Sequence, residues 1–395
     1  MSDLLLPADE AGLAAAVAAA HAAREPIAVE GNGSKRGLLR PVQAARTLST
    51  RNLAGITLYR PSELVISARA GTPLPHIEAA LAEKGQHLIA EPPDTRAVFG
   101  TQAPATLGGI VAANLSGPRR IAWGAMRDHV LGIRFVNGEG EVLRSGGRVL
   151  KNVTGLDLCK LLAGSYGTLG VMTEITLKVL PAPQAQATIA VRVPDAAAGV
   201  RALSAGLGSP YGVTGAAVVP AGAAPDGPAE TLAFLRIEDF APSVAYRTGR
   251  LAEDLAPHGA VQVIEGAESR ALWTSIRDAL PLGARAEEAL WRVSVRPSAG
   301  PGVLEAARAI GGRGLLDWGG GLAWVAGPAV PAAHDAIAAA AGGGTCTLFR
   351  APEALRLAVA VLPEEPAPLA AIGRRVKAAL DPRGILNPGR MRAGA

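Results

Sequence analysis

Three glycine-rich segments hold the residues of this chain that are best suited to bind an anion. The first, residues 29–35, reads VEGNGSK and joins two glycines to a serine hydroxyl and a lysine ammonium group. Glycine tolerates positive φ angles, so successive backbone N–H groups can converge on one negatively charged ligand. The spacing fits neither the Walker A motif nor GxGxxG, which argues against a P-loop hydrolase and a Rossmann fold. Taken alone, the segment is also compatible with a plain tight turn.

The other two segments combine glycine with small side chains. Residues 105–120 read ATLGGIVAANLSGPRR, and residues 164–171 read GSYGTLGV and lead directly into residues 173–180. In that last stretch apolar and polar residues alternate, which predicts a half-buried strand with one wet face. Small residues let the backbone approach a flat ligand closely, although in residues 105–120 they also fit a tightly packed helix–sheet crossing.

Histidine and cysteine are scarce. No two of the six histidines stand at metal-ligand spacing, and His129 alone lies within a motif, DHVLG at residues 128–132. His129 heads a predicted strand, so a structural role is favoured over that of a catalytic base. The two cysteines, Cys159 and Cys346, can supply neither a disulfide framework nor the four thiolates of an iron–sulfur cluster. The sequence therefore predicts no metal site.

The composition of the chain argues against several classes of function. The chain has 395 residues, is 49% hydrophobic and 18% charged, and carries a net charge of +5, which is enough for a large core and two domains. Its basic residues are scattered without interleaved aromatic residues, which argues against nucleic-acid binding and favours small anions such as a pyrophosphate or a carboxylate. No apolar run approaches eighteen residues and no signal peptide is recognisable. We therefore expect a cytoplasmic protein without a membrane span.

The best domain boundary is Pro181-Ala182-Pro183, where the alternating pattern is interrupted. From about residue 184 to 360, strands alternate with Ala-rich helices, which is consistent with a second, α+β domain. Apolar residues at helical spacing then precede the turn DPRG at residues 381–384. No internal repeat is apparent.

These segments, in this order and spacing, resemble the vanillyl-alcohol-oxidase-type (PCMH-type) FAD-binding family. DHVLG, KNVTGLDL at residues 151–158 and the tail DPRGILNPGR at residues 381–390 carry the same resemblance. Within that family the chain is most similar to the FAD-binding E subunits of bacterial glycolate oxidases (glycolate dehydrogenases), through RPSELVI at 60–66, LWRVS at 290–294 and LDWGG at 316–320. The first loop lacks the histidine that attaches FAD covalently in some relatives, so we expect FAD to be bound non-covalently.

The resemblance implies an α+β fold in three parts. A PCMH-type FAD-binding domain, residues 1–182, would have subdomains of about 1–58 and 59–182 with FAD between them. A smaller ferredoxin-like α+β domain, 183–360, would cover the reactive side of the flavin, and the tail, 361–395, would return to the first domain. The residues expected to contact FAD are Glu30, Gly31, Asn32, Gly33, Ser34, Lys35, Pro92, Thr106, Gly108, Gly109, Ala112, Ser116, Gly117, Arg119, Gly164, Ser165, Gly167, Thr168, Gly170, Val171 and Asn387.

The implied function is that of an FAD-binding subunit in a multi-subunit enzyme that oxidises glycolate, a 2-hydroxy acid, to glyoxylate. Catalytic relatives hold a metal with paired histidines and an acidic residue before the terminal signature. Here residues 342–350 read GGGTCTLFR, and no histidine follows His334. We therefore expect a sister FAD subunit to carry the metal-assisted oxidation and an iron–sulfur subunit to accept the electrons. Such a complex could associate peripherally with the inner membrane.

Two alternatives stay open at this point. The chain could be a self-sufficient FAD-dependent hydroxy-acid oxidoreductase, or a non-catalytic assembly subunit that has lost FAD. A self-sufficient enzyme needs a base for the hydroxyl group and a cation for the carboxylate. The candidates are His129 for the base and Arg277, Arg292, Arg296 and Arg350 for the cation, although each arginine also fits a surface or ion-pair role.

Overall fold

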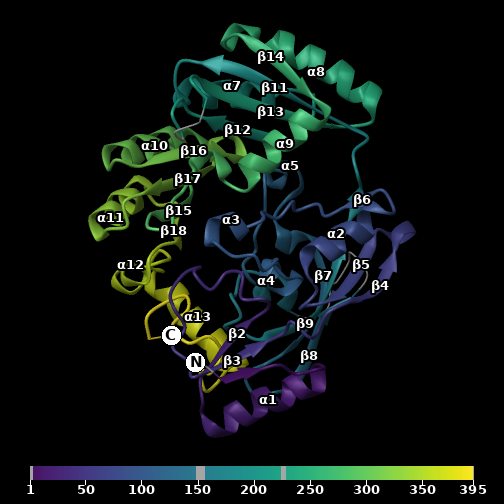
Figure 1. The fold of residues 1–395 in the computed structure, drawn as a ribbon, viewed down its shortest axis with the longest axis vertical. Coiled ribbons are helices and arrows are strands. Elements are labelled where there is room, and N and C mark those ends of the chain that lie inside the picture. The colour runs from purple at the N-terminus through teal and green to yellow at the C-terminus, as the bar shows by residue number, and fades with distance from the viewer. Residues whose placement is uncertain (1–2, 148–155, 224–227, 395) are drawn as a thin grey trace.

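A computed structural model of the chain describes residues 3–147, 156–223 and 228–394 (Figure 1). Residues 151–155 of the KNVTGLDL motif lie outside the described residues. The described residues form four sheets, of three, two, eight and five strands, packed with helices. The predicted α+β class is confirmed.

A five-stranded antiparallel sheet forms the centre of the N-terminal region, which comprises the chain through residue 181. Its order is β4-β5-β9-β7-β8. The strands are β4 (Ile56–Arg60), β5 (Val65–Arg69), β7 (Val130–Val136), β8 (Val142–Gly146) and β9 (Val171–Lys178). The helices of this region are α1 (Glu10–Ala23), α2 (Leu74–Ala82), α3 (Arg96–Phe99), α4 (Leu107–Ala112), α5 (Arg120–Trp123) and α6 (Leu158–Leu162).

The wet face predicted for residues 173–180 is only partly present, because Glu174 and Lys178 are half-buried while Thr176 is buried. Strand β9 is the middle strand of the sheet, and both Thr173 and Thr176 are buried. Thr173 donates a hydrogen bond to Glu10 at the start of α1, and Thr176 bonds to Ser67 on β5 at 2.8 Å. Helix α1 and the neighbouring strand thus cover Thr173 and Thr176, while Glu174 and Lys178 remain partly exposed.

A second, three-stranded sheet runs parallel in the order β1-β3-β2, with β1 (Asp3–Leu5), β2 (Ile27–Glu30) and β3 (Arg46–Ser49). Its core joins α1 to the C-terminal tail, because Leu13 and Ile27 pack with Ile385 and Leu386. Leu386 also forms a parallel bridge with Ile27. The tail therefore extends this sheet beside β2, and in Figure 1 both chain ends lie next to β2 and β3.

The eight-stranded antiparallel sheet, called the C-terminal sheet below, has the order β14-β11-β13-β12-β16-β17-β15-β18. Its strands are β11 (Ala185–Val193), β12 (Gly215–Val219), β13 (Thr231–Asp239), β14 (Val261–Glu265), β15 (Ala289–Ser294), β16 (Arg313–Asp317), β17 (Leu322–Gly327) and β18 (Thr345–Arg350). Its helices are α7 (Ala196–Leu207), α8 (Ala241–Leu255), α9 (Gly266–Arg277), α10 (Gly300–Ala309) and α11 (Pro331–Ala340), with the short helix η6 (Trp318–Gly320) after β16.

The order of this sheet reveals a repeat that the sequence did not indicate. Strands β11 to β14 with α7 and α8 form one βαββαβ unit, and β15 to β18 with α10 and α11 form another. In each unit the fourth strand lies beside the first, then the third and the second, and the units join where β12 pairs with β16. The repeat is one of topology, consistent with the expected ferredoxin-like architecture.

The chain then returns through α12 (Glu353–Ala358) and α13 (Ala367–Leu380) to the tail. The predicted boundary at residues 182 and 183 falls between β10 (Leu180–Pro181), which pairs with β6 (Gln86–His87), and β11 of the C-terminal sheet. The division into domains with these limits stays a prediction.

Candidate functional site

A cavity of about 470 Å³ opens between β2, α4, α12 and the tail. We call it the loop cavity. Its wall is formed by residues 28–38, 41, 42, 44 and 47, by residues 106, 109, 112 and 113, by Tyr166, by Glu353 and Arg356, and by Asn387 and Arg390. Segments from five parts of the sequence thus meet at one site.

The first glycine-rich loop forms one side of the loop cavity, and its backbone is held from outside. Ser49 at the end of β3 donates a hydrogen bond to the Gly31 carbonyl at 2.7 Å, and Asn32 donates to the Pro104 carbonyl at 3.0 Å. A Cβ atom on Gly31 would lie 2.2 Å from the Thr106 hydroxyl oxygen, so only glycine allows this approach of the loop to α4.

The loop cavity holds cations that form no ion pair with a carboxylate among the described residues; besides Arg356, these are Lys35 and Arg390. Burial, together with neighbouring Arg390, lowers the pKa of Lys35 to about 8, and burial lowers the pKa of Arg390 to about 10. Lys35 contacts the Ser34 hydroxyl at 3.2 Å, and Arg390 donates to three backbone carbonyls, the shortest bond being 3.0 Å to Lys35. Neither forms an ion pair among the described residues. Such a site suits a diphosphate, which would compensate both charges.

The tail closes the loop cavity through Asn387. Its side-chain oxygen accepts a hydrogen bond from the Val29 N–H at 2.7 Å, and its side-chain nitrogen donates to the Tyr166 carbonyl at 2.8 Å. Lys377 on α13 donates to the Thr168 carbonyl at 2.7 Å and forms an ion pair with Asp381. These contacts fix the tail between β2 and the third glycine-rich segment.

Comparison with known proteins agrees with this geometry. A family described as FAD binding domain matches residues 3–146. The chain is 37% identical to glycolate oxidase subunit GlcE of Escherichia coli K12 over 372 residues, which cover 94% of this chain and 93% of that protein.

The chain belongs to the GlcE family of glycolate oxidase subunits. It is also 30% identical to glycolate oxidase subunit GlcD of Bacillus subtilis, but over only 42% of this chain and 34% of that protein. Among solved structures, p-cresol methylhydroxylase with substrate bound superposes with a TM-score of 0.74 at 13% identity, covering 98% of this chain and 88% of that one. This likeness confirms the PCMH-type fold. The protein is thus an FAD-dependent oxidoreductase subunit.

About half of the residues expected to contact FAD line the loop cavity of this GlcE-family protein. They are Glu30, Gly31, Asn32, Gly33, Ser34, Lys35, Thr106, Gly109, Ala112 and Asn387. The residues that lie elsewhere are Pro92, Gly108, Ser116, Gly117, Arg119, Gly164, Ser165, Gly167, Thr168, Gly170 and Val171.

Several residues of the second set have packing partners that account for their small size. A Cβ atom on Gly108 would lie 2.9 Å from the Ala70 side chain, and one on Gly170 would lie 2.6 Å from the Phe135 ring. The hydroxyl groups of Ser116 and Ser165 bond to the backbone at 2.8 Å. The tight-packing alternative weighed for residues 105–120 therefore applies to Gly108.

Fourteen residues that line the loop cavity were absent from the expected set, and four of them, Tyr166, Glu353, Arg356 and Arg390, carry polar or charged groups from other parts of the chain. Tyr166 and Arg390 lie inside motifs that were recognised, so their positions carried a signal. Glu353 and Arg356 lie on α12, far from any motif. Arg356 donates to the Leu39 carbonyl at 3.1 Å, a contact between distant segments that no local pattern indicates.

Most catalytic candidates have protein partners. Arg277 forms an ion pair with Asp278 at 2.7 Å. Arg350 donates to the carbonyls of Val98 at 2.9 Å and of Glu288 at 3.0 Å, so it joins the C-terminal sheet to the segment at α3. His129 is buried, which lowers its pKa, and its Nε2 has no hydrogen-bond partner among the described residues. The exposed Arg296 precedes a short helix and lines no cavity described for the chain.

Arg350 also has a buried nitrogen, Nε, without a hydrogen-bond partner among the described residues, but Arg292 differs in that its guanidinium group contacts two tryptophan rings. It lies on β15 and stacks on Trp318 with 4.7 Å to the ring centroid, and Trp324 lies at 5.7 Å. Burial lowers its pKa to about 10. Its Nη2 atom is buried and has no hydrogen-bond partner among the described residues.

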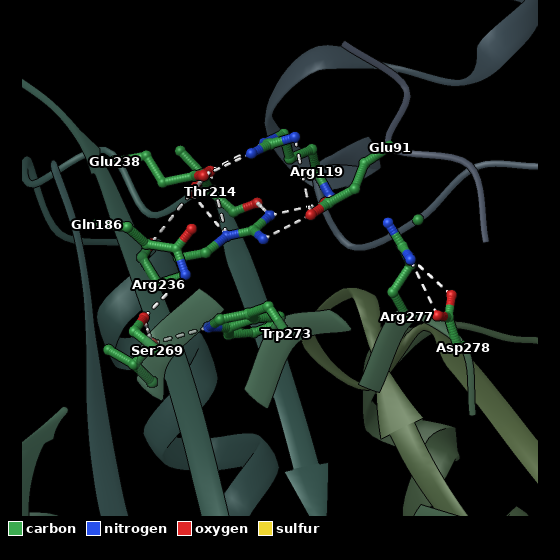
Figure 2. Close-up of polar contacts among 12 residues, drawn as sticks. Glu91, Arg119, Gln186, Thr214, Arg236, Glu238, Ser269, Trp273, Arg277 and Asp278 are labelled. Atoms are coloured by element: carbon green, nitrogen blue, oxygen red, sulfur yellow. Dashed lines mark hydrogen bonds and ion pairs between the residues drawn. The ribbon is translucent and has the colours of Figure 1, made fainter. Parts of the chain in front are cut away.

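Arg119, expected at FAD, belongs instead to a charge cluster between the N-terminal region and the C-terminal sheet (Figure 2). Arg236 donates to Glu91 at 2.8 and 2.9 Å, and Arg119 donates to Glu238 at 2.7 and 3.0 Å. Although burial opposes ionisation, Arg236 and Arg119 lower the pKa of Glu238 to about 2. We call Glu91, Arg119, Arg236 and Glu238 the closed cluster, because every charge in it has a partner of opposite sign.

No three His, Cys, Asp or Glu side chains among the described residues lie close enough together to hold a metal ion. No helix in the same part of the chain is long and apolar enough to cross a bilayer.

Proposed function

We propose that the loop cavity holds FAD non-covalently, with the pyrophosphate at residues 31–35 beside Lys35 and Arg390. The observation that carries this proposal is that Lys35 on the loop and Arg390 on the tail, in segments that the sequence singled out, line the cavity without a carboxylate partner among the described residues. Asn387 and Tyr166 would hold the wall next to the cofactor. When bound, FAD supplies a two-electron acceptor for the oxidation of the substrate.

We further propose that the chain acts within a multi-subunit glycolate oxidase, where glycolate is oxidised to glyoxylate and electrons pass to an iron–sulfur subunit. The family supports this proposal, because its E. coli member is named as one subunit of glycolate oxidase. The two cysteines are both buried and too few to ligate a cluster, so an iron–sulfur centre would have to come from another chain. A sister FAD subunit would supply the metal-assisted step. We expect the complex in the cytoplasm, with any membrane contact made through its partners.

The test is reconstitution. The purified chain should show the visible absorbance of oxidised flavin, and acid should release the chromophore because it is not covalently attached. Alone, the chain should reduce a dye with glycolate only slowly, and addition of the sister and iron–sulfur subunits should restore the rate. Absence of flavin absorbance would contradict the FAD site. Full activity of the isolated chain would contradict the division of labour between subunits.

A second test concerns the tail. Truncation after residue 380 removes Asp381, Asn387 and Arg390 and should therefore release FAD during gel filtration. A matched variant, Arg374→Met, changes an exposed residue of α13 and should retain the flavin. Equal retention by both proteins would contradict the placement of the tail at the cofactor.

One observation favours the second candidate, a self-sufficient hydroxy-acid oxidoreductase. The free Nη2 of Arg292 is a buried donor of the kind that holds a substrate carboxylate. If the isolated chain turns over glycolate and Arg292→Met abolishes the turnover, this candidate replaces the first.

A further inference from the structure

Trp318 lies between the N-terminal region and the C-terminal sheet and carries two arginines on its indole ring. The guanidinium carbon of Arg120 lies 4.3 Å from the ring centroid, and that of Arg292 lies 4.7 Å from it. The indole N–H donates to the Gly117 carbonyl at 3.0 Å. Trp318 itself has a left-handed backbone, with φ of 54°, and Gly319 and Gly320 continue with positive φ. A strained turn therefore holds the ring in place against both regions.

Neither arginine forms an ion pair with a described residue. We call Arg120 and Arg292 the open pair, because no ion pair between described residues includes either of them and Arg292 keeps a free Nη2. Burial lowers the pKa of both, and the charge of Arg120 lowers that of Arg292 further. Stacking on an aromatic ring only partly offsets the loss of water around a buried cation. Both charges are therefore available to an anionic ligand.

Asp317 is the acidic group that precedes Trp318, and burial keeps it largely protonated below pH 7. Its carboxylate accepts a hydrogen bond from the Trp318 N–H at 2.7 Å. Burial raises the pKa of Asp317 to about 7; nearby Glu91 acts in the same direction, while Arg236 and Arg292 oppose it. In the sheet register Leu315 and Arg292 both lie opposite Trp324, so Asp317, two residues after Leu315, shares the Arg292 face.

Tyr166 connects the open pair to the loop cavity. It forms part of the cavity wall, and burial raises its pKa, while the positive charges of Arg292 and Arg390 oppose that rise. Arg292 and Arg390 therefore act on the same phenol, one from the C-terminal sheet and one from the tail. The open pair thus lies near the site proposed for FAD and not on a remote surface.

We propose that Arg120 and Arg292, held on Trp318, bind the carboxylate of a small organic acid. A guanidinium group that stacks through its face keeps its N–H edge free, and that edge matches the two oxygens of a planar carboxylate. A 2-hydroxy acid and the 2-oxo acid formed from it share this group. The inference rests on the proposed function for its link to oxidation, but the binding itself can be measured separately.

The experiment uses the FAD-loaded chain and three probes: glycolate, glyoxylate and the non-oxidisable dianion oxalate. Isothermal titration calorimetry and difference absorbance of the flavin should both report saturable binding of one molecule per chain. Arg292→Met should weaken oxalate binding at least tenfold, and Arg120→Met should weaken it by a smaller factor. Arg292→Lys, which keeps the charge but loses the planar fork, should fall between wild type and Arg292→Met. Arg201→Met, at an exposed position of α7, is the matched control and should bind like wild type.

Each outcome either supports the proposed carboxylate site or overturns it. Comparable binding of phosphate or chloride would show an unspecific cationic site and overturn the proposal, as would full oxalate affinity in Arg292→Met. If Arg292→Met does not fold, Arg292→Lys and Arg120→Met make the same test. Tighter binding of glycolate than of glyoxylate would support a substrate site, and the reverse order would support a product site. A chain that retains FAD and ignores all three acids overturns this inference alone, whereas a chain without FAD overturns the proposed function.

Discussion

Arg236 and Arg292 lie on strands of the same C-terminal sheet, and each guanidinium carbon lies 4.7 Å from the centroid of a tryptophan ring. Their electrostatic surroundings are opposite. Arg236 forms ion pairs with Glu91 at 2.8 Å and with Glu238 at 3.2 Å. Arg292 forms none among the described residues and has a free Nη2. The buried Arg236 thus joins two regions of the protein, while the partly exposed Arg292 has a charge without an ion-pair partner among the described residues.

Adjacent residues on one loop serve the two sites. Arg119 pairs with Glu238 in the closed cluster, and Arg120 stacks on Trp318 in the open pair. The loop that carries both arginines packs directly against the backbone at Glu91, since a Cβ atom on Gly117 would be 2.1 Å from the Glu91 carbonyl oxygen. We infer that the closed cluster fixes the loop from which Arg120 projects. The comparison predicts that the same substitution will have different consequences at the two sites.

The largest effect is expected when the closed cluster is broken. Arg236→Met leaves Glu91 and Glu238 buried with only Arg119 to compensate them, and removal of one member of a buried ion pair typically costs about 3–5 kcal/mol. Urea unfolding of the FAD-loaded protein should show this loss. The control is Arg192→Met on the adjacent strand β11, where an exposed ion pair with Glu230 should contribute about 0–1 kcal/mol. Equal losses of unfolding free energy in both variants would mean that the closed cluster contributes no more than an exposed ion pair.

The different surroundings of Arg119 and Arg120 show what could not be predicted from the sequence. Arg119 and Arg120 are neighbours of the same chemistry, and their motif indicated a ligand for Arg119. Which of them is neutralised depends on Glu238, more than a hundred residues away, and no local pattern carries that information. The same holds for Arg356, which reaches the loop cavity because α12 packs near Leu39.

What the sequence did predict rests on backbone constraints. Gly31 and Asn32 were assigned to an anion-binding loop because glycine tolerates unusual φ angles, and both line the loop cavity. The wet face expected for residues 173–180 was only partly right: Glu174 and Lys178 are half-buried, but alternation cannot show that Thr176 is buried beside Ser67 of β5. The repeated βαββαβ unit also escaped notice, since the two copies share a topology and not a motif.

The second-largest effect on stability is expected from Asp317, the acidic residue beside the open pair. The pKa of Asp317 is raised from 3.8 to about 7, so between these values the folded protein holds a proton that the unfolded chain releases. Stability should therefore fall as pH rises from about 4 to 7, by about 2–4 kcal/mol for a shift of this size. Asp317→Asn keeps an acceptor for the Trp318 N–H and should remove this dependence. Parallel stability curves for variant and wild type across that range would contradict the protonated state of Asp317.

A smaller effect is expected at Lys35 in the loop cavity, which also forms no ion pair among the described residues. Its pKa of about 8 means that the free chain loses this charge as pH rises through 8, while a bound diphosphate would favour the charged form. FAD affinity should therefore decline above pH 8. Lys35→Met should weaken FAD binding about tenfold at pH 7, or about 1.4 kcal/mol, and make it independent of pH. Fluorescence titration of the apoprotein measures both; an affinity that stays pH-dependent in the variant would assign the titration to another group.

The smallest change in stability is expected from Arg292→Met, and its smallness distinguishes the open pair from the closed cluster. The substitution loses the stacking contact with Trp318, which contributes about 0.5–2 kcal/mol. It also removes an uncompensated buried charge and one unsatisfied donor, which relieves a cost of similar size. No carboxylate is left without a partner, unlike in Arg236→Met. The unfolding free energy should therefore stay within about 1 kcal/mol of the wild-type value. A loss as large as that of Arg236→Met would mean that Arg292 already has a compensating partner in the folded chain, and the two arginines would then belong to the same class.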